Sequence, residues 1–143
     1  EFNYCYPSDS TNTTFSFSKH QGKVFMIIIS ATWSGSCYQS IPLVEEIYQN
    51  WENDNRVEIV YFLDDIGQPY SCSQWGNSGT SGIPPIVDDG ISDDVYNSFE
   101  HPTNAVGEYP VIIFINDAME VAEIMDSYPT LTEANSIIES MLE

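Results

Sequence analysis

Two apolar strand-like runs separated by one amphipathic segment constrain the fold of this chain more than any other feature. Val24–Ser30 and Val57–Leu63 are continuous apolar runs rich in β-branched residues, which predicts two strands buried on both faces. Between them, from Ser36 to about Asn53, apolar residues recur at helical spacing: Ile41, Val44, Ile47, Tyr48 and Trp51. The order strand, helix, strand favours a parallel pair joined by a right-handed crossover.

Further signals lie on both sides of this unit. The stretch TFSFSK alternates apolar and polar residues and predicts a short edge strand or an N-terminal hairpin. Val111–Ile115, the turn NDAM and Glu120–Met125 predict an antiparallel hairpin. Thr130 and Glu133 have the spacing of a capping box, which predicts the start of a last helix. One face of that helix carries Leu131, Ala134, Ile137, Ile138 and Met141.

The middle of the chain gives weaker signals. Residues 68–90 are rich in Gly, Ser and Pro, which predicts a loop with short helical turns. Ser92 is a candidate cap for a short helix that carries Val95, Tyr96 and Phe99. Neither an internal repeat nor a second domain pattern is present, so we expect residues 1–143 to form a single domain.

The charge balance excludes several classes of partner. The chain is 42% hydrophobic over 143 residues, enough for one globular core, and no apolar run approaches the ~20 residues that span a bilayer. Acidic residues number 22 against three basic ones, Lys19, Lys23 and Arg56, for a formal net charge of −19. Nucleic acid and anionic membranes are therefore poor partners. The acidic stretch VDDGISDD lacks the order of an EF-hand loop, so we expect a solvated surface, no metal site and no cofactor.

Three cysteines limit the redox chemistry. Cys5, Cys37 and Cys72 have no C-x-x-C spacing, so a structural zinc site is not expected. Two pairings are open: a structural bridge between Cys5 and Cys72, and a non-local redox pair of Cys37 and Cys72. Abundant Asn, Ser, Thr and Tyr with few Lys, together with the absence of an initiating Met, favour a mature, exported chain in a periplasmic or extracellular setting.

The turn after the first buried strand carries a motif. GKVFMIIISATWSGSCYQSIP resembles the thioredoxin signature, in which a strand ends in Trp-Cys-x-x-Cys and the following helix has a proline five residues after the second Cys. Trp33, Cys37 and the kink proline Pro42 match this pattern. Ser34 stands where the first Cys belongs, so the motif is a degenerate Trp-Ser-Gly-Ser-Cys.

A second segment extends the resemblance. NAVGEYPVIIFIND is similar to the thioredoxin segment whose cis-proline faces the active-site turn, which implies that role for Pro110, with Tyr109 before it. The lead-in TFSFSKHQGKVFMIIISATW resembles the TlpA-like and redoxin branch of the thioredoxin-like superfamily. The match covers about residues 13–53 and 105–142. It implies a thioredoxin fold of the α/β class, with a central mixed β-sheet flanked by helices and an N-terminal β-hairpin extension.

The motif departs from that of an active thioredoxin. There the first Cys attacks a disulfide from a helix N-terminus and the second Cys resolves it, whereas a serine hydroxyl is too weak an acid for the attack. We therefore interpret Ser34 as an N-cap and Cys37 as a buried packing residue. The buried acid of familiar thioredoxins corresponds to Ile28 here. Asp64 and Asp65 end the neighbouring strand, where a solvated turn is favoured over a role at the site.

Other origins of the motif are less well supported. A peroxidase of this superfamily would need a Cys near position 34 with a Thr three residues earlier, and Ala31 occupies that place. A substitution that disarms a natural enzyme would usually change the second Cys and keep the first, the reverse of this pattern. Whether Ser34 is natural stays open at this point.

Aromatic residues near the motif are candidates for a peptide groove. Trp33, Tyr38, Tyr109 and Trp75 would surround the turn in that case, and the backbone beside the cis-proline commonly pairs with extended chains in this fold. For each of the four except Trp33, packing in the core is the favoured interpretation.

Two functions from different classes follow. The leading hypothesis is thiol-disulfide exchange with protein or peptide thiols through Cys37, alone or with Cys72 as a non-local partner. The alternative is a non-catalytic module that binds a peptide or a partner domain. The candidate substrate-binding residues at the turn and the cis-proline are Trp33, Gly35, Ser36, Tyr109 and Pro110.

Overall fold

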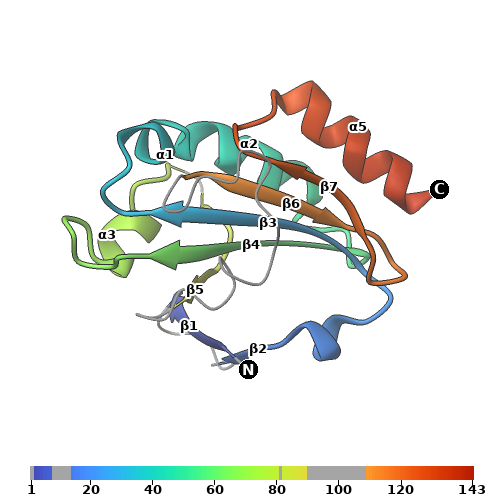
Figure 1. Cartoon of the computed structure of the whole chain (residues 1–143), viewed down its shortest axis with the longest axis horizontal. Helices are drawn as coiled ribbons and strands as arrows, with labels where there is room; N and C mark the ends of the chain where they lie inside the picture. The colour runs from blue at the N-terminus through green and yellow to red at the C-terminus, as the bar shows by residue number, and fades with distance from the viewer. Residues whose placement is uncertain (1, 8–13, 81, 90–108) are drawn as a thin grey trace.

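A seven-stranded mixed sheet forms the centre of the molecule in a computed structural model that describes residues 2–7, 14–80, 82–89 and 109–143 (Figure 1). The strand order is β2-β1-β5-β4-β3-β6-β7. The strands are β1 (Phe2–Tyr6), β2 (Thr14–Phe15), β3 (Val24–Ala31), β4 (Val57–Asp64), β5 (Ile86–Asp88), β6 (Val111–Ile115) and β7 (Val121–Met125). The expected central mixed sheet is therefore confirmed.

Parallel and antiparallel pairs divide the sheet as the sequence predicts. β3 pairs in parallel with β4, and the hairpin of β6 and β7 continues the sheet beyond β3 in antiparallel fashion. On the other side, the expected N-terminal hairpin of β1 and β2 joins the sheet through β5. β5 falls in the segment predicted as a loop, and that prediction is wrong for residues 86–88. Three residues are too short a run to show strand periodicity, and pairing with β4 and β1 fixes them as a strand.

Helices α1 (Gly35–Gln39), α2 (Ile41–Trp51) and α5 (Leu131–Leu142) lie on one face of the sheet (Figure 1). The single helix predicted from Ser36 to Asn53 is wrong in one respect, because it is divided at Ser40. The Ser40 N–H donates to carbonyls of α1, and Pro42, which has no N–H, follows in the first turn of α2. The predicted capping box of α5 is present, with Thr130 and Glu133 each bonding the other's backbone N–H.

The core has two layers, one on each face of the sheet. Alternate residues of β3 enter them, so that Met26 and Ile28 pack under α1, α2 and α5, while Phe25, Ile27 and Ile29 pack on the opposite face. All eight residues of β3 are buried, as the continuous apolar run predicts. The opposite layer is closed by η1 (Phe17–His20) and by the aromatic rings of the N-terminal hairpin, including Phe15.

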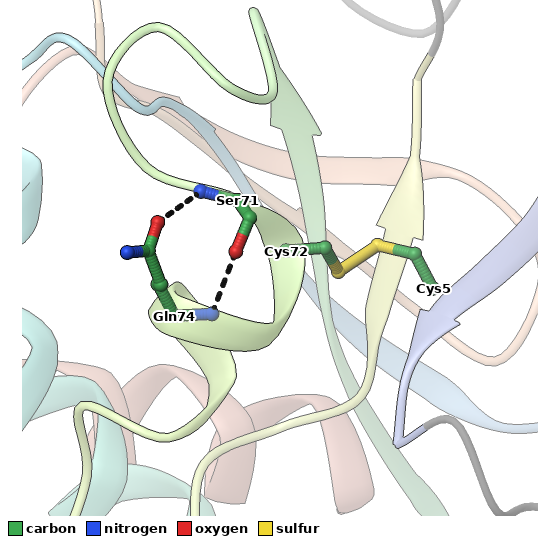
Figure 2. Close-up of a disulfide and its surroundings, with 4 residues drawn as sticks. All are labelled: Cys5, Ser71, Cys72 and Gln74. Atoms are coloured by element: carbon green, nitrogen blue, oxygen red, sulfur yellow. Dashed lines mark hydrogen bonds between the residues drawn. A yellow bond between two sulfur atoms is a disulfide. The ribbon is translucent and has the colours of Figure 1, made fainter.

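A disulfide between Cys5 and Cys72 fastens the N-terminal hairpin to the rest of the domain (Figure 2). Cys5 lies on β1 and Cys72 begins the short helix α3 (Cys72–Gly76), with 6.1 Å between their Cα atoms. Ser71 and Gln74 form a capping box at the same helix (Figure 2). The ring of Tyr6 lies so close to Gly76 that a Cβ there would be 2.3 Å from it, so only glycine allows this contact.

The helix predicted after Ser92 lies outside the described residues, as does most of the stretch VDDGISDD. Within the described residues, no helix is long and apolar enough to cross a membrane. Nor do three or more His, Cys, Asp or Glu side chains converge as metal ligands in the described ranges.

Candidate functional site

Three segments that are distant in sequence meet at one edge of the sheet. β3 and β4 are parallel and in register from Val24 and Val57 to Ala31 and Asp64, so their carboxyl ends lie together. β6 runs antiparallel to β3, and Val111 at its start pairs with Ile29. The turn after β3, the loop after β4 and the residues before β6 therefore lie together in what we call the site edge. The name refers to the ends of these central strands and not to an outermost strand of the sheet. Its residues are 32–37, 64–68 and 109–110.

The motif turn holds Trp33 outside and Ser34 inside. The Trp33 side chain is 51% exposed, whereas Ser34 is 7% exposed. Ser34 has extended backbone at the N-cap of α1, where its Oγ accepts from the Cys37 N–H at 3.4 Å. Gly35 and Ser36, in the first turn of α1, are exposed. The Ser34 hydroxyl is thus bound to the helix backbone, and it has the geometry of a cap rather than of a nucleophile.

Cys37 is fully buried beneath this turn. Its relative exposure is 0%, and it is the free thiol among the described cysteines. Tyr61 of β4 and Tyr128, before α5, face the thiol. Burial, and secondarily electrostatic interaction with Cys37 or with each other, raises the pKa of both tyrosine hydroxyls far above the usual value. Both hydroxyls therefore stay protonated at neutral pH, and Cys37 has no exposed surface in this conformation.

Two consecutive carboxylates, Asp64 and Asp65, brace the aromatic side chains of the site edge. The Tyr109 hydroxyl donates to Asp64 Oδ2 at 2.5 Å, and the Trp33 indole N–H donates to Asp65 Oδ2 at 2.7 Å. The two rings meet edge to face, with 5.5 Å between their centroids. For Asp64 the expected solvated turn is wrong, because its side chain is 0% exposed and lies under the site edge. Two adjacent acids after a strand are the only sequence signal that marks them.

Thr32 ties the motif turn to the loop that carries these carboxylates. Its hydroxyl donates to the Asp65 carbonyl and accepts from the Gln68 N–H at 3.3 Å, and its own N–H donates to the Asp64 carbonyl. Asp65 has a positive φ of 54°, and Gly67 has one of 88°, so the loop folds back tightly on the turn. The peptide bond between Tyr109 and Pro110 is cis. Pro110 is buried beside Tyr109.

The structure separates the four aromatic candidates into two groups. Trp33 and Tyr109 form the pair just described, while Tyr38 stacks on Tyr70 at 4.5 Å and meets Trp75 edge to face at 5.7 Å. Trp75 is 0% exposed and belongs to the helix-side core. A single groove lined by all four side chains is therefore not formed, and the favoured core interpretation holds for Trp75.

The cysteines are also separated. Of the two pairings left open by the sequence, the structure contains the Cys5–Cys72 bridge, because β1 passes beside the start of α3. The alternative partnership of Cys37 and Cys72 is not present, since Cys72 is already bridged and Cys37 carries a free thiol. Chemically, the site edge thus offers an exposed braced indole, a neighbouring tyrosine and a buried single thiol.

Comparison with known proteins identifies the fold. No protein-family model matches the chain, and no curated protein matches its sequence. Among solved structures, dsbF of MTB is 16% identical with a TM-score of 0.72, covering 89% of this chain and 87% of the other. A thioredoxin-family thiol:disulfide interchange protein from Chlorobium tepidum is 15% identical with a TM-score of 0.72, covering 92% and 88%. The exposed lipoprotein thioredoxin of Streptococcus pneumoniae is 20% identical with a TM-score of 0.61, covering 91% of each chain.

These likenesses establish that the chain has the thioredoxin fold expected from its motif segments. At such low identity they establish the fold alone. The function must therefore be argued from the site edge itself.

Proposed function

We propose that this chain is a non-catalytic thioredoxin-fold module that binds an extended peptide or a partner segment at the site edge. The contact residues are Trp33, Gly35 and Ser36 on the motif turn, with Tyr109 and Pro110 opposite them. An extended chain beside Pro110 would use the backbone next to this proline for hydrogen bonds and the aromatic pair for side-chain contact. The similar structure from Chlorobium tepidum is named a thiol:disulfide interchange protein, which supports a protein or peptide as the partner.

The observation that carries this proposal is the contrast between Trp33 and Cys37. The indole is 51% exposed, although it is large, apolar and held by a hydrogen bond and a ring contact. A fixed aromatic side chain loses little conformational entropy on binding, and aromatic residues are enriched among binding hot spots. The thiol four residues later is 0% exposed, and Ser34 stands in place of the first motif cysteine. The residue offered to a partner is therefore the tryptophan and not the sulfur.

Selection from a displayed library of random 12-residue peptides tests the proposal. Peptides retained by the wild-type chain are expected to bind Cys37→Ala with unchanged affinity and to lose at least tenfold in affinity on Trp33→Ala, as expected for truncation of a hot-spot side chain. Val121→Ala is the matched control, because Val121 is also an exposed apolar residue, at 47%, but lies on β7. Retained peptides that bind Trp33→Ala as well as the wild type would refute a site at the motif turn.

Thiol-disulfide exchange through Cys37 is the second candidate. It is favoured by the shared fold, since two of the similar structures carry thiol-disulfide interchange or thioredoxin names. In that case Cys37→Ala abolishes exchange with a dithiol reporter, whereas unchanged turnover excludes the mechanism. Its burial requires the turn to open before the thiol reacts, so the wild-type chain should react with a thiol reagent far more slowly when native than when unfolded.

Restoring the first motif cysteine separates a lost nucleophile from a lost site. Ser34→Cys places a thiol at the N-cap of α1, in the same helical turn as Cys37, and is expected to create or greatly raise insulin-reducing activity. An inactive variant that still folds would show that the surroundings of the turn have also lost the ability to support exchange.

A further inference from the structure

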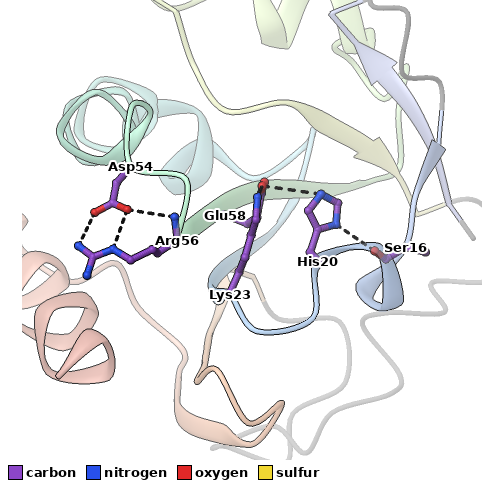
Figure 3. Close-up of polar contacts among 6 residues, drawn as sticks. All are labelled: Ser16, His20, Lys23, Asp54, Arg56 and Glu58. Atoms are coloured by element: carbon purple, nitrogen blue, oxygen red, sulfur yellow. Dashed lines mark hydrogen bonds and ion pairs between the residues drawn. The ribbon is translucent and has the colours of Figure 1, made fainter.

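The three Lys and Arg side chains of this protein all lie at one end of the sheet. Lys23 and Arg56 directly precede β3 and β4, and Lys19 lies on η1, which leads into β3. We call this the opposite edge, because it holds the amino ends of β3 and β4. Figure 3 shows the ion pairs that Lys23 makes with Glu58, and Arg56 with Asp54, each at 2.8 Å. Residues 90–108 contain no Lys or Arg.

The carboxylates of the site edge bond to neutral donors. Asp65 Oδ2 accepts from the Trp33 indole, and Asp64 Oδ2 accepts from the Tyr109 hydroxyl. The indole N–H that bonds Asp65 is a neutral donor, so it orients this carboxylate without supplying a countercharge, unlike Lys23 in its ion pair with Glu58. The net charge of −19 adds a negative potential over the whole molecule. A partner that approaches Trp33 therefore meets Asp65 within a protein of strongly negative net charge.

Trp33 supplies the second element of recognition for a cation. The negative face of an indole attracts Lys and Arg side chains, and among aromatic residues tryptophan binds cations best. Here a carboxylate accepts from the indole N–H at 2.7 Å, which pushes electron density toward the ring and strengthens that attraction. The ring is held in place by Tyr109 and remains 51% exposed. Exposure, ring electrostatics and the nearby carboxylates thus favour the same kind of partner group.

We infer that the segment bound at the site edge is basic, and that a Lys or Arg side chain of the partner packs on the exposed Trp33 face beside Asp65. The inference rests on the proposed binding function and specifies the chemistry of its partner. Asp65 acts in two ways, as the acceptor that orients the indole and as the countercharge for the cation. An acidic or purely apolar segment would lack both attractions.

Three synthetic ten-residue peptides test the inference. Each alternates Ser with one other residue, which is Lys, Gln or Glu, so that length and backbone are the same. Binding to the ¹⁵N-labelled whole chain is followed at the indole N–H resonance of Trp33, with the indoles of Trp51 and Trp75 as internal controls. The Lys peptide is expected to shift the Trp33 resonance and to bind at least about fivefold more tightly than the Gln peptide. Its affinity should fall as salt is raised, and the Glu peptide should not bind.

Asp65→Asn isolates the charge of the carboxylate. Asn keeps an oxygen that can accept from the indole N–H and tolerates the positive φ at this position. The variant is expected to weaken binding of the Lys peptide about two- to fivefold and to leave the Gln peptide unchanged. Asp117→Asn is the matched control, because it makes the same change in net charge at the β6–β7 turn. That turn lies at the opposite edge, where β6 ends beside the start of β3.

The outcomes separate this inference from the proposal on which it rests. Equal binding of the Lys and Gln peptides, both detected at Trp33, would overturn the preference for basic segments and leave the binding site intact. Lys-peptide shifts around the acid-lined hollow of Trp51 and Glu52, with none at Trp33, would show non-specific attraction and also overturn it. If no peptide binds at Trp33, the inference fails, and the library selection then decides whether the binding function fails with it.

Discussion

The two edges of the sheet use similar residues in opposite ways. At the opposite edge, Glu58 bonds to Lys23, and the Asp54 carboxylate forms a two-pronged pair with Arg56 (Figure 3). At the site edge, Asp64 and Asp65 accept instead from the uncharged groups of Tyr109 and Trp33. One edge neutralises its charge locally, while the other uses its charge to hold aromatic rings in position.

This difference explains why the proposed binding site is at the site edge and not at the opposite edge. A pair of exposed opposite charges contributes little to stability and presents nothing specific to a partner. Carboxylates that orient an indole and a phenol make a surface whose geometry is fixed before binding. Four substitutions test this contrast between the two edges, beginning with the one whose expected effect is greatest.

Removing the disulfide is expected to have the largest effect on stability. Cys5→Ala with Cys72→Ala opens a cross-link between residues 67 apart in sequence, and such a loss typically lowers the free energy of unfolding by about 2–4 kcal/mol. Chemical denaturation measures it, and the reduced wild type should unfold at the same denaturant concentration. Hydrogen exchange should rise in β1, α3 and the Asp65 loop and not at the opposite edge. An equal rise at both edges would show that the bridge does not act locally.

Tyr109→Phe removes the donor to the buried Asp64 carboxylate. We expect the free energy of unfolding to fall by about 1–3 kcal/mol, because a buried acceptor loses a hydrogen bond. The Trp33 indole resonance should move as well, since its ring contact is altered. Tyr70→Phe is the matched control, because the Tyr70 hydroxyl has no hydrogen-bond partner in the described part of the chain. Equal losses in the two variants would mean that the Asp64 hydrogen bond is not the cause.

Lys23→Met tests the ion pair at the opposite edge. Methionine keeps most of the aliphatic stem and removes the charge that meets Glu58 at 2.8 Å. Because both side chains are partly exposed, we expect a loss of roughly 0.5 kcal/mol in the free energy of unfolding, and less in 1 M salt. Urea titration at both salt concentrations measures it. A loss as large as that of Tyr109→Phe would remove the distinction drawn between the edges.

Arg56→Ala is expected to change the pKa of Asp54 more than it changes the stability of the fold. Hydrogen bonds from Arg56 lower the pKa of Asp54 to about 2, so the variant should return that pKa toward its ordinary value near ~3.9. A lowered carboxyl pKa favours the folded state above the ordinary pKa, and this contribution is lost as the pH falls through about 2. A ¹³C NMR titration of the side-chain carboxyl measures it. Arg56→Lys, which keeps the charge without the fork, should give an intermediate pKa.

Much of the fold could be predicted from the chain because it depends on local patterns. The runs that become β3 and β4 bury both faces, and their apolar composition alone indicates this. The capping box at Thr130 needs only four consecutive residues to be recognised. The single helix predicted from Ser36 to about Asn53 is divided at Ser40, where a break of one residue leaves the apolar spacing unchanged on either side.

The motif turn of the candidate site could be predicted from the sequence, but the roles of the residues that hold the turn could not. Trp33 and Ser34 stand in a motif that can be read along the chain. The roles of Asp64 and Asp65 cannot be read in this way, because two acids after a strand are usually solvated. Asp64 is buried here because the parallel register of β3 and β4, and the start of β6, bring Tyr109 over it.

Read along the chain, the residues predict the central strand–helix–strand unit, the hairpin of β6 and β7, the last helix, the buried faces of the central strands and a motif with a single cysteine. Short-range periodicity and residue chemistry decide these features, since each depends on neighbours along the chain. Tertiary contacts fix the pairing of Cys72 with Cys5, the burial of Cys37 below the turn and the hydrogen bond by which Asp65 holds the exposed Trp33. Each of those facts is a contact between segments far apart in sequence, and sheet register brings such segments together.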